Sequence, residues 1–357
     1  MKLKTNENIQ YLRGIAALLV VMAHTVSSFT TYKDIGGIAN IILVNLELLG
    51  QVGVGVFFII SGYIMSMTTN NKRGGSLSAR QFMLKRLVRI YPIYFIWTSV
   101  LLILWWFGFI LKSHDFSIIK IITSYLLIPY SSFEGEAIDP VLRQGWTLIY
   151  EAFYYICFAG LIFIDKFRKI GVYTLLVFFI LLNILSMLMI YPAAQSFFGS
   201  HVIFLFLIGM FIFHHQEDII RRIKTHSVRS IFLVIFSLLV LLIALKDSAL
   251  GNYAQYLHYL AAIILFLYLF TAHKVSGIVL KIGNSSYSLY LTHTFLTLGY
   301  AVIVRSGRFS NVTLFALGIL TFFIAIVVGE IAYRLIERKI IYKTAAVAHV
   351  SPPLVKP

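Results

Sequence analysis

Long runs of apolar residues, separated by short polar or basic segments, fill most of the chain as far as about residue 340. A helix that crosses a bilayer needs roughly 20 mostly apolar residues. Ten runs reach or approach that length. We expect spanning helices at residues 9–31, 50–69, 92–111, 146–164, 170–190, 201–215, 229–245, 254–272, 285–304 and 311–333. The pattern therefore predicts an all-α integral membrane protein with about ten transmembrane helices.

An eleventh apolar run covers residues 118–130 and meets a proline at Pro129. The run is shorter than a crossing helix requires. We therefore expect an interfacial or re-entrant helix there instead of another span.

The 30 lysine and arginine residues are distributed unevenly among the segments that join the predicted spans. If the N-terminus is cytoplasmic, 23 of them lie in segments on the cytoplasmic side and 7 in segments on the other side. Cytoplasmic loops of membrane proteins carry an excess of lysine and arginine. An even number of spans brings the C-terminus back to the same side. We therefore predict that the N- and C-termini are both cytoplasmic.

Composition supports the membrane class. Hydrophobic residues make up 59% of the chain and charged residues only 12%, where an ordinary soluble domain carries about 25% charged residues. The mean hydropathy is +0.87. Too little polar surface remains to cover a water-soluble core of this size.

The net charge of +16 raises the question of a nucleic-acid partner. The basic residues are scattered between apolar runs and do not form one patch, so we expect no nucleic acid. The one cysteine, Cys157, excludes an intramolecular disulfide and a cysteine metal cluster. Because no spacing typical of metal ligands occurs, we expect no metal.

Arg13 and His24 are polar residues inside the first predicted span. Eleven residues along a helix amount to three turns and about 20°, so the two share one face about 16 Å apart. Ionisable residues within a membrane are functional candidates by default. The alternative is an arginine that reaches lipid phosphates and a histidine bonded to a nearby carbonyl.

Arg86 and Arg89 lie in a basic segment that ends with Tyr91 and Pro92. At a spacing of three residues they face the same way in a helix. Two guanidinium groups side by side suit phosphate through paired, charge-assisted hydrogen bonds. The alternative is a cytoplasmic anchor that touches anionic lipid heads.

Two further polar positions lie within spans. Glu151 follows Trp146 by little more than one turn, and a carboxylate facing His24 would fix its tautomer. The alternative is a structural carboxylate paired with an arginine or with tyrosine hydroxyls. His293 either lines the same cavity or is a buried packing residue.

Together these residues resemble the membrane-bound acyltransferase-3 family, whose members O-acylate bacterial cell-surface sugars. The likeness covers nearly the whole chain, and its details are closest to the exopolysaccharide acetylation branch. It is carried by Tyr11–Ala17 with His24, Gly53–Tyr63, Arg86–Pro92, Trp146–Leu148 with Glu151, Tyr154 and Tyr155, Tyr287–Tyr290 with His293, and Glu337-Arg338. The closing Glu-Arg-Pro of the family reads Glu337-Arg338-Lys339 here.

The resemblance implies an O-acyltransferase of the bacterial cytoplasmic (inner) membrane, surrounded by lipids, with residues 1–343 as one transmembrane acyltransferase domain. Residues 344–357 are expected to be a disordered cytoplasmic tail. The donor would be cytosolic acyl-CoA, most simply acetyl-CoA, and the acceptor a cell-surface polysaccharide or lipid-linked oligosaccharide. The expected site comprises His24 and Glu151 for catalysis, Arg13, Arg86, Arg89 and Tyr91 for the donor, and Trp146, Tyr150, Tyr154 and His293 for the acceptor.

Two other functions fit the same polar residues. A proton-coupled secondary transporter or flippase for a glycan or lipid-linked sugar also uses histidine and glutamate inside the membrane. A non-catalytic membrane subunit of a polysaccharide-synthesis complex would need neither residue. An essential His24 argues against the subunit, and dependence on acyl-CoA argues against the transporter.

Overall fold

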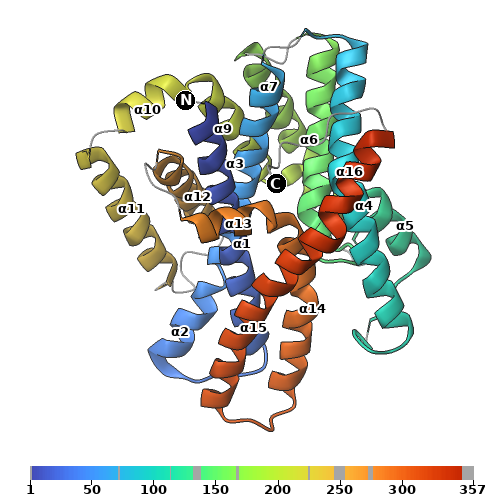
Figure 1. Cartoon of the computed structure of the whole chain (residues 1–357), viewed down its shortest axis with the longest axis vertical. Coiled ribbons are helices and arrows are strands. Elements are labelled where there is room, and N and C mark those ends of the chain that lie inside the picture. Colours follow the sequence, from blue (N-terminus) through green and yellow to red (C-terminus); the bar gives the residue numbers. More distant parts are fainter. Residues whose placement is uncertain are drawn as a thin grey trace. The chain divides into compact units, whose positions relative to one another are not determined.

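The computed structural model describes residues 2–70, 73–112, 114–131, 138–165, 169–223, 226–244, 254–271 and 276–347. Within these residues every regular element is a helix, which confirms the all-α prediction (Figure 1). The helices are α1 Lys2–Thr30, α2 Gly37–Leu46, α3 Leu49–Thr69, α4 Ser76–Trp106, α5 Ile118–Leu126, α6 Gly145–Phe163, α7 Lys169–Ser186, α8 Pro192–Gly199, α9 Ile203–His214, α10 Gln216–Ile223, α11 His226–Ala244, α12 Ala254–Phe270, α13 Gly277–Asn284, α14 Ser286–Arg305, α15 Asn311–Ala332 and α16 Arg338–Val347.

Eight stretches of described helix are long and apolar enough to cross a membrane, so the chain is a multi-pass membrane protein. Three of these stretches join consecutive helices: α2 with α3, α8 with α9, and α15 with α16. A ninth candidate is the pair Gln216–Ile223 and Val228–Leu242, which is bent by 92°. The apolar helix Gln255–Phe270 is shorter. The exact number of spans and the side of the termini stay predictions. The predicted spans 229–245 and 254–272 each end just outside the described residues.

The helix that contains the predicted third span begins much earlier than expected. The sequence placed that span at 92–111, but α4 runs without a break from Ser76 to Trp106 with Pro92 inside it. A proline lacks the N–H of one helical hydrogen bond, and it commonly marks a helix start. Packing of α4 along α6 supports the helix through this point. The basic segment with Arg86 is therefore part of the long helix.

The chain forms two compact units, each built from two separated stretches of sequence. Unit 1 comprises Met1–Ile60 and His215–Leu335, and unit 2 comprises Ser61–His214 and Ile336–Pro357. The single domain predicted over residues 1–343 stays a prediction, because compact units of this kind also occur within one domain.

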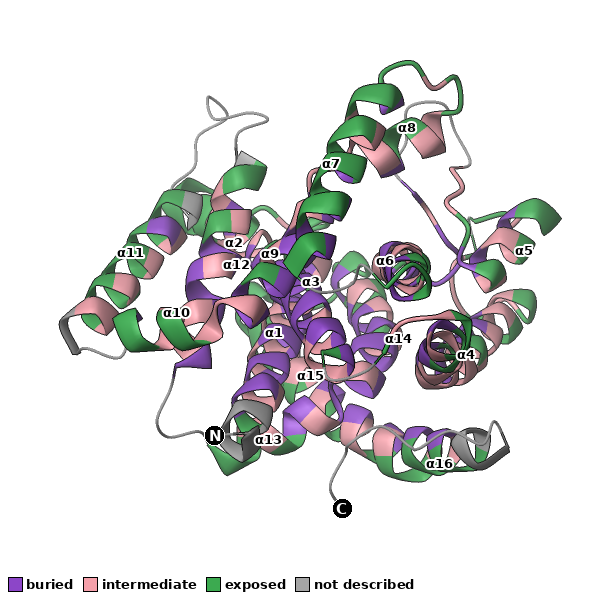
Figure 2. Ribbon diagram, turned by 90° about the horizontal axis from the view of Figure 1, so that it is seen from above, coloured by how far each residue is buried: buried purple, intermediate pink, exposed green. Residues whose placement is uncertain are grey.

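In unit 1, α1 is the central helix and packs against α2, α12, α13, α14 and α15. Most of its described side chains are buried or half-buried, as the purple and pink ribbon of Figure 2 shows. Helix α13 approaches α1 closely at Gly283, where a glycine is required because a Cβ would overlap the carbonyl oxygen of Gln10. The core beside it contains Ala17, Val21, Ile282, Leu289 and Ala325.

In unit 2, α4 packs along α6 and α16, while α7 packs on α8 and α9. Tyr154 of α6 stacks on Phe206 of α9 with ring centroids 4.2 Å apart. Many large apolar side chains of α7 are exposed, and its ribbon is mostly green in Figure 2. Such an exposed apolar face suits contact with lipid tails.

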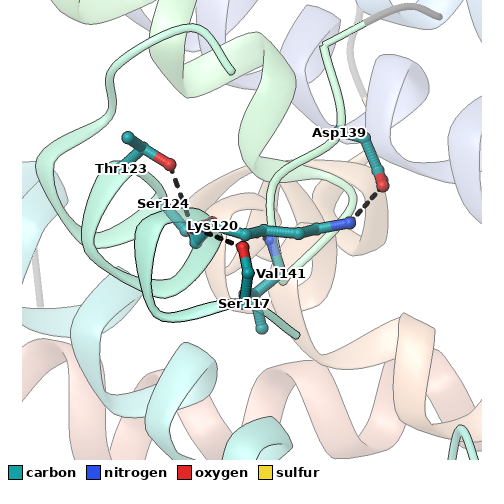
Figure 3. Close-up of polar contacts among 6 residues, drawn as sticks. All are labelled: Ser117, Lys120, Thr123, Ser124, Asp139 and Val141. Carbon is teal, nitrogen blue, oxygen red and sulfur yellow. Dashed lines mark hydrogen bonds and ion pairs between the residues drawn. The ribbon is translucent and has the colours of Figure 1, made fainter. Parts of the chain in front are cut away.

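The short helix predicted at 118–130 is present as α5, which covers only Ile118–Leu126 (Figure 3). Its interfacial or re-entrant placement stays a prediction. Its N-terminus is capped by Ser117, whose hydroxyl accepts from the Lys120 N–H at 3.2 Å. Lys120 is 6% exposed, and its ammonium forms an ion pair with Asp139. The Val141 N–H donates to Ser124 Oγ at 2.8 Å. These contacts tie α5 to the segment that leads into α6.

The end of the described chain is helical. After α15, a π-helical segment Tyr333–Glu337 leads into α16, which continues to Val347. The helix thus passes the boundary predicted at residue 343. The rest of the predicted tail, residues 348–357, lies outside the described residues.

Candidate functional site

Two histidines predicted for the site lie side by side in unit 1. His24 comes from α1 and His293 from α14, and their ring centroids are 5.2 Å apart with planes inclined at 32°. His24 is exposed. His293 is fully buried, with 0% of its surface exposed. Packing of α1 against α14 therefore creates a pair with one accessible and one enclosed imidazole.

The hydrogen bonds of His293 define its tautomer. Its Nδ1 lies 3.0 Å from the carbonyl oxygen of Leu289, one turn earlier in α14. A carbonyl oxygen only accepts, so Nδ1 carries the proton and donates. In the neutral ring, Nε2 then holds a lone pair. This Nε2 is buried and has no hydrogen-bond partner among the described residues.

Aromatic rings enclose the buried histidine on the side of α3. The Tyr290 ring lies 6.0 Å from the His293 ring, and Phe57 meets Tyr290 edge to face at 6.0 Å. Their contacts hold His293 in place beside His24. A purely packing role for His293 is compatible with these rings, but it gives no use for the Nε2 lone pair.

Arg13 and His24 lie on one continuous helix, α1, as the sequence predicted. Only 9% of Arg13 is exposed. An arginine that reaches out to lipid phosphates would keep its guanidinium accessible. The structure therefore favours a guanidinium held within unit 1 over the lipid-contact alternative.

Arg86 in unit 2 is enclosed by side chains of α3, α4 and α6. It is 8% exposed, and its Nη2 donates to Thr68 Oγ1 at 3.2 Å. Its guanidinium carbon lies 5.3 Å from the Phe82 ring centroid and 5.5 Å from that of Tyr155. Contacts of a cation with ring faces are favourable by about 0.5–2 kcal/mol. A surface anchor to lipid heads does not describe this environment.

Arg89 differs from Arg86 although the two are only three residues apart. Arg89 is half-buried, so part of its side chain is accessible. Tyr91, also predicted for the donor, is half-buried and donates from its hydroxyl to the Leu126 carbonyl at 3.4 Å. The two arginines thus share a helix but have unequal access to a ligand.

The Glu151 carboxylate has two hydroxyl donors within unit 2. Ser61 Oγ donates to it at 2.7 Å, and the Tyr155 hydroxyl donates to the same oxygen. This is the tyrosine-paired carboxylate that the sequence left open as an alternative. Because Tyr155 also contacts Arg86 through its ring, Glu151 and Arg86 belong to one connected cluster. The role of Glu151 toward His24, which lies in unit 1, stays a prediction.

The three aromatic residues predicted for the acceptor differ in access. Tyr150 and Tyr154 are buried, and their hydroxyls donate to the carbonyls of Phe197 at 3.2 Å and Val202 at 3.4 Å. Trp146 is half-buried and meets Tyr150 edge to face at 5.8 Å. Of the three, Trp146 has the most accessible ring for stacking on a sugar.

Several partners of these groups were not predicted from the sequence. Thr68, Phe82 and Leu289 were not singled out, yet each contacts a predicted site residue. Phe82 precedes Arg86 by four residues, and Leu289 precedes His293 by four. Residues four apart meet on a helix face, so the spacing of Phe82 and Arg86 was an available signal. Leu289 contributes only its backbone carbonyl, for which its residue type gives no signal.

Comparison with known proteins identifies the family of this chain. The sequence model of the acyltransferase-3 family, described as an acyltransferase domain, matches residues 6–330. The chain belongs to the acyltransferase-3 family. Its helices and its family together establish a membrane acyltransferase.

Two relatives of this acyltransferase illustrate the range of likeness. The exopolysaccharide production protein ExoZ of Rhizobium meliloti (strain 1021) is 28% identical over 313 residues, which are 84% of this chain and 92% of ExoZ. An uncharacterized protein of Haemophilus influenzae is 30% identical over 141 residues, which are 36% of this chain and 57% of that protein. No solved structure matches the acyltransferase.

Proposed function

We propose that this acyltransferase transfers an acetyl group from cytosolic acetyl-CoA to a hydroxyl group of a bacterial cell-surface glycan. The observation that carries the proposal is the exposed His24, held beside a fully buried histidine in a chain of the acyltransferase-3 family. A glycan hydroxyl is a poor nucleophile near neutral pH. An accessible imidazole is the group best suited to take its proton.

In the proposed reaction, the glycan oxygen attacks the carbonyl carbon of the thioester. A carbon–oxygen bond forms and the carbon–sulfur bond breaks, so the acetyl group becomes an ester of the glycan. His24 accepts the hydroxyl proton and passes it to the departing thiolate, which leaves as the CoA thiol. A positioned general base contributes typically about 10²–10⁴-fold to the rate. In a variant of this mechanism, His24 carries the acetyl group before the glycan receives it.

The donor is recognised through its phosphates. Arg89 is the more accessible of the two α4 arginines, so it makes the direct phosphate contact. Arg86 is enclosed by Thr68 and two aromatic rings, and it supplies positive charge from within the unit. Arg13 and Tyr91 complete the predicted donor residues.

The acceptor is a cell-surface polysaccharide or a lipid-linked oligosaccharide. The name of ExoZ speaks of exopolysaccharide production, and likeness to it over most of both chains supports an exopolysaccharide acceptor for this acyltransferase. Trp146 stacks on a sugar face, as an accessible aromatic ring does in many carbohydrate sites. Tyr150 and Tyr154 are buried, and they support the acceptor region by packing within unit 2.

The proposed setting is the bacterial cytoplasmic membrane, with about ten spans and both termini in the cytoplasm. The excess of 23 basic residues over 7 supports this orientation. It exposes the donor residues of α4 to cytosolic CoA, and the bundle then serves as the route by which the acetyl group reaches a glycan outside.

Labelled acetyl-CoA tests the proposal directly. The acceptor is the cell's own surface glycan, from which mild alkali has first removed the existing esters. Membranes that contain the wild-type chain should transfer label to this glycan. His24→Ala should lower that transfer at least about 100-fold while the protein still inserts. NMR of glycan from a deletion strain should show lost acetyl signals. Unchanged acetylation in His24→Ala would remove the central claim.

The same assay tests the other functions. A proton-coupled transporter or flippase, and a non-catalytic subunit, both predict that no label passes from acetyl-CoA to glycan when the purified chain acts alone. Label that stays on the purified protein after removal of acetyl-CoA indicates the acyl-carrier variant. Label found only on glycan indicates direct transfer.

A further inference from the structure

The buried nitrogen of His293 is the starting point. Its Nδ1 donates to the Leu289 carbonyl, and Nε2 has no hydrogen-bond partner among the described residues. A buried acceptor without a donor is destabilising, because it has lost its hydrogen bonds to water. Buried polar atoms in proteins almost always have a hydrogen-bond partner. We therefore expect that Nε2 receives a hydrogen bond from a donor in the active protein.

The ring of His24 is within reach to supply that donor. Two imidazoles joined by a straight N–H···N bond have centroids about 5 Å apart, because an N···N distance of about 2.9 Å adds to about 1.1 Å within each ring. The observed centroid separation is 5.2 Å. This separation matches the one that such a bond requires, so a turn of the accessible His24 ring toward Nε2 needs no change in the spacing of the two rings.

The difference in burial decides which ring turns. His293 is fully enclosed and held by Leu289 and by the Tyr290 ring. His24 is exposed. A substrate hydroxyl does not reach Nε2 itself, because that atom has no accessible surface. The neighbouring side chain that the geometry offers as donor is His24.

We propose that His293 is the positioning residue for His24. Its Nε2 accepts a hydrogen bond from one ring nitrogen of His24, so the proton of the neutral His24 ring is fixed on that nitrogen. The other nitrogen then carries the lone pair and faces the accessible side, where the hydroxyl binds. The inference rests on the proposed function and adds the group that orients its base.

A carboxylate usually orients a catalytic histidine. Here the neutral imidazole of His293 takes that position within unit 1. Glu151, which the sequence suggested for this task, already accepts hydrogen bonds from Ser61 and Tyr155 within unit 2. A neutral partner controls tautomer and orientation without adding a second charge to the membrane interior.

The test measures steady-state acetyl transfer from labelled acetyl-CoA to de-esterified surface glycan, with the purified full-length chain in detergent. His293→Phe keeps an aromatic ring and removes the acceptor. We expect kcat to fall about 100-fold, with the KM for acetyl-CoA changed less than about threefold, because the loss concerns the base and not donor binding. His293→Gln keeps an oxygen near the place of Nε2, and it should recover at least about tenfold of the loss.

A double variant separates positioning from a structural role. If His293 acts only through His24, adding His293→Phe to His24→Ala lowers the residual rate no further. His258→Phe is the matched control, since His258 is a buried histidine of α12 in the same unit. It should retain wild-type kcat. The unfolding midpoint of each variant in detergent identifies any that do not fold, and His293→Leu replaces His293→Phe in that case.

The outcomes are distinct. Wild-type kcat in His293→Phe, equal losses in the phenylalanine and glutamine variants, or additive losses in the double variant would each overturn the inference while leaving the proposed function intact. Absence of CoA-dependent acetyl transfer by the wild-type chain would overturn the proposed function, and this inference would fall with it.

Discussion

Ser61 Oγ donates a hydrogen bond of 2.7 Å to the carboxylate of Glu151, and so joins α3 to α6 inside unit 2. The Tyr155 hydroxyl donates to the same carboxylate oxygen, and the Tyr155 ring faces the Arg86 guanidinium. One carboxylate and one guanidinium thus share a tyrosine between them. Hydrogen bonds to a charged group are stronger than those between neutral groups, so this cluster holds three helices in register.

Glu151→Gln tests whether the charge of this cluster matters for acyl transfer. The glutamine keeps the size and one oxygen acceptor but removes the negative charge beside Arg86. We expect acetyl transfer to fall at least about tenfold, since charge-assisted hydrogen bonds are worth about 1.5–3 kcal/mol. Radiolabel on glycan is the measurement. Wild-type activity in Glu151→Gln, together with loss of activity in Tyr155→Phe, would show that transfer depends on the tyrosine hydroxyl and not on the carboxylate charge.

Arg86→Lys and Arg89→Lys should separate the two arginines. Lysine lacks the planar guanidinium that lies against Phe82 and Tyr155, so Arg86→Lys should lower the unfolding midpoint in detergent. Arg89→Lys should leave that midpoint unchanged and raise the KM for acetyl-CoA about tenfold, through loss of paired phosphate contacts. Arg222→Lys, at an exposed position of α10, is the control and should change neither quantity. The reverse assignment of the two effects would contradict the structure.

Gly283→Ala tests the close approach of α13 to α1. The new methyl group would overlap the Gln10 carbonyl, and such overpacking costs about 1–3 kcal/mol of unfolding free energy. Gly277→Ala is the matched control in the same helix, because a Cβ there meets nothing within 4 Å. It should leave stability unchanged or raise it by about 0.5 kcal/mol. Denaturant unfolding in detergent measures both, and equal effects would contradict the packing described.

The Lys120–Asp139 ion pair of Figure 3 predicts a coupled effect. Asp139→Asn leaves a buried ammonium without its carboxylate and should destabilise the chain by about 1–3 kcal/mol, less than for a fully enclosed pair because Asp139 is partly exposed. Adding Lys120→Met removes that buried charge and should restore part of the loss. A double variant that is less stable than Asp139→Asn alone would show that the charge is solvated.

Much of the fold can be predicted from hydropathy, because a membrane stabilises continuous apolar helices whose backbone groups are all hydrogen-bonded. The predicted spans 50–69, 146–164 and 285–304 each fall on a described helix with nearly the same bounds. The start of α4 was missed, since residues 76–91 are too polar to resemble a span and Pro92 resembles a helix start. Short helices such as α2 and α13 were also missed, because eight to ten residues carry too little periodic signal.

The candidate site was only partly predictable for a different reason. His24, Arg86 and Glu151 could be selected singly, because polar residues in apolar helices are conspicuous. Their surroundings could not, since these depend on which helix faces meet. The two arginines of α4 look equivalent along the sequence, and only the neighbouring α6 and α3 make one of them buried.

The sequence by itself determined that this is an all-helical, multi-pass membrane protein with a few polar residues inside its spans, because apolar length and charge follow directly from residue identity. It also carried the family resemblance. Only the tertiary structure decided that the ring centroids of His24 and His293 lie 5.2 Å apart and that Nε2 of His293 is enclosed. It also decided that Glu151 accepts hydrogen bonds from Ser61 and Tyr155. Contacts between residues far apart in the chain arise from helix packing, which no local pattern of residues encodes.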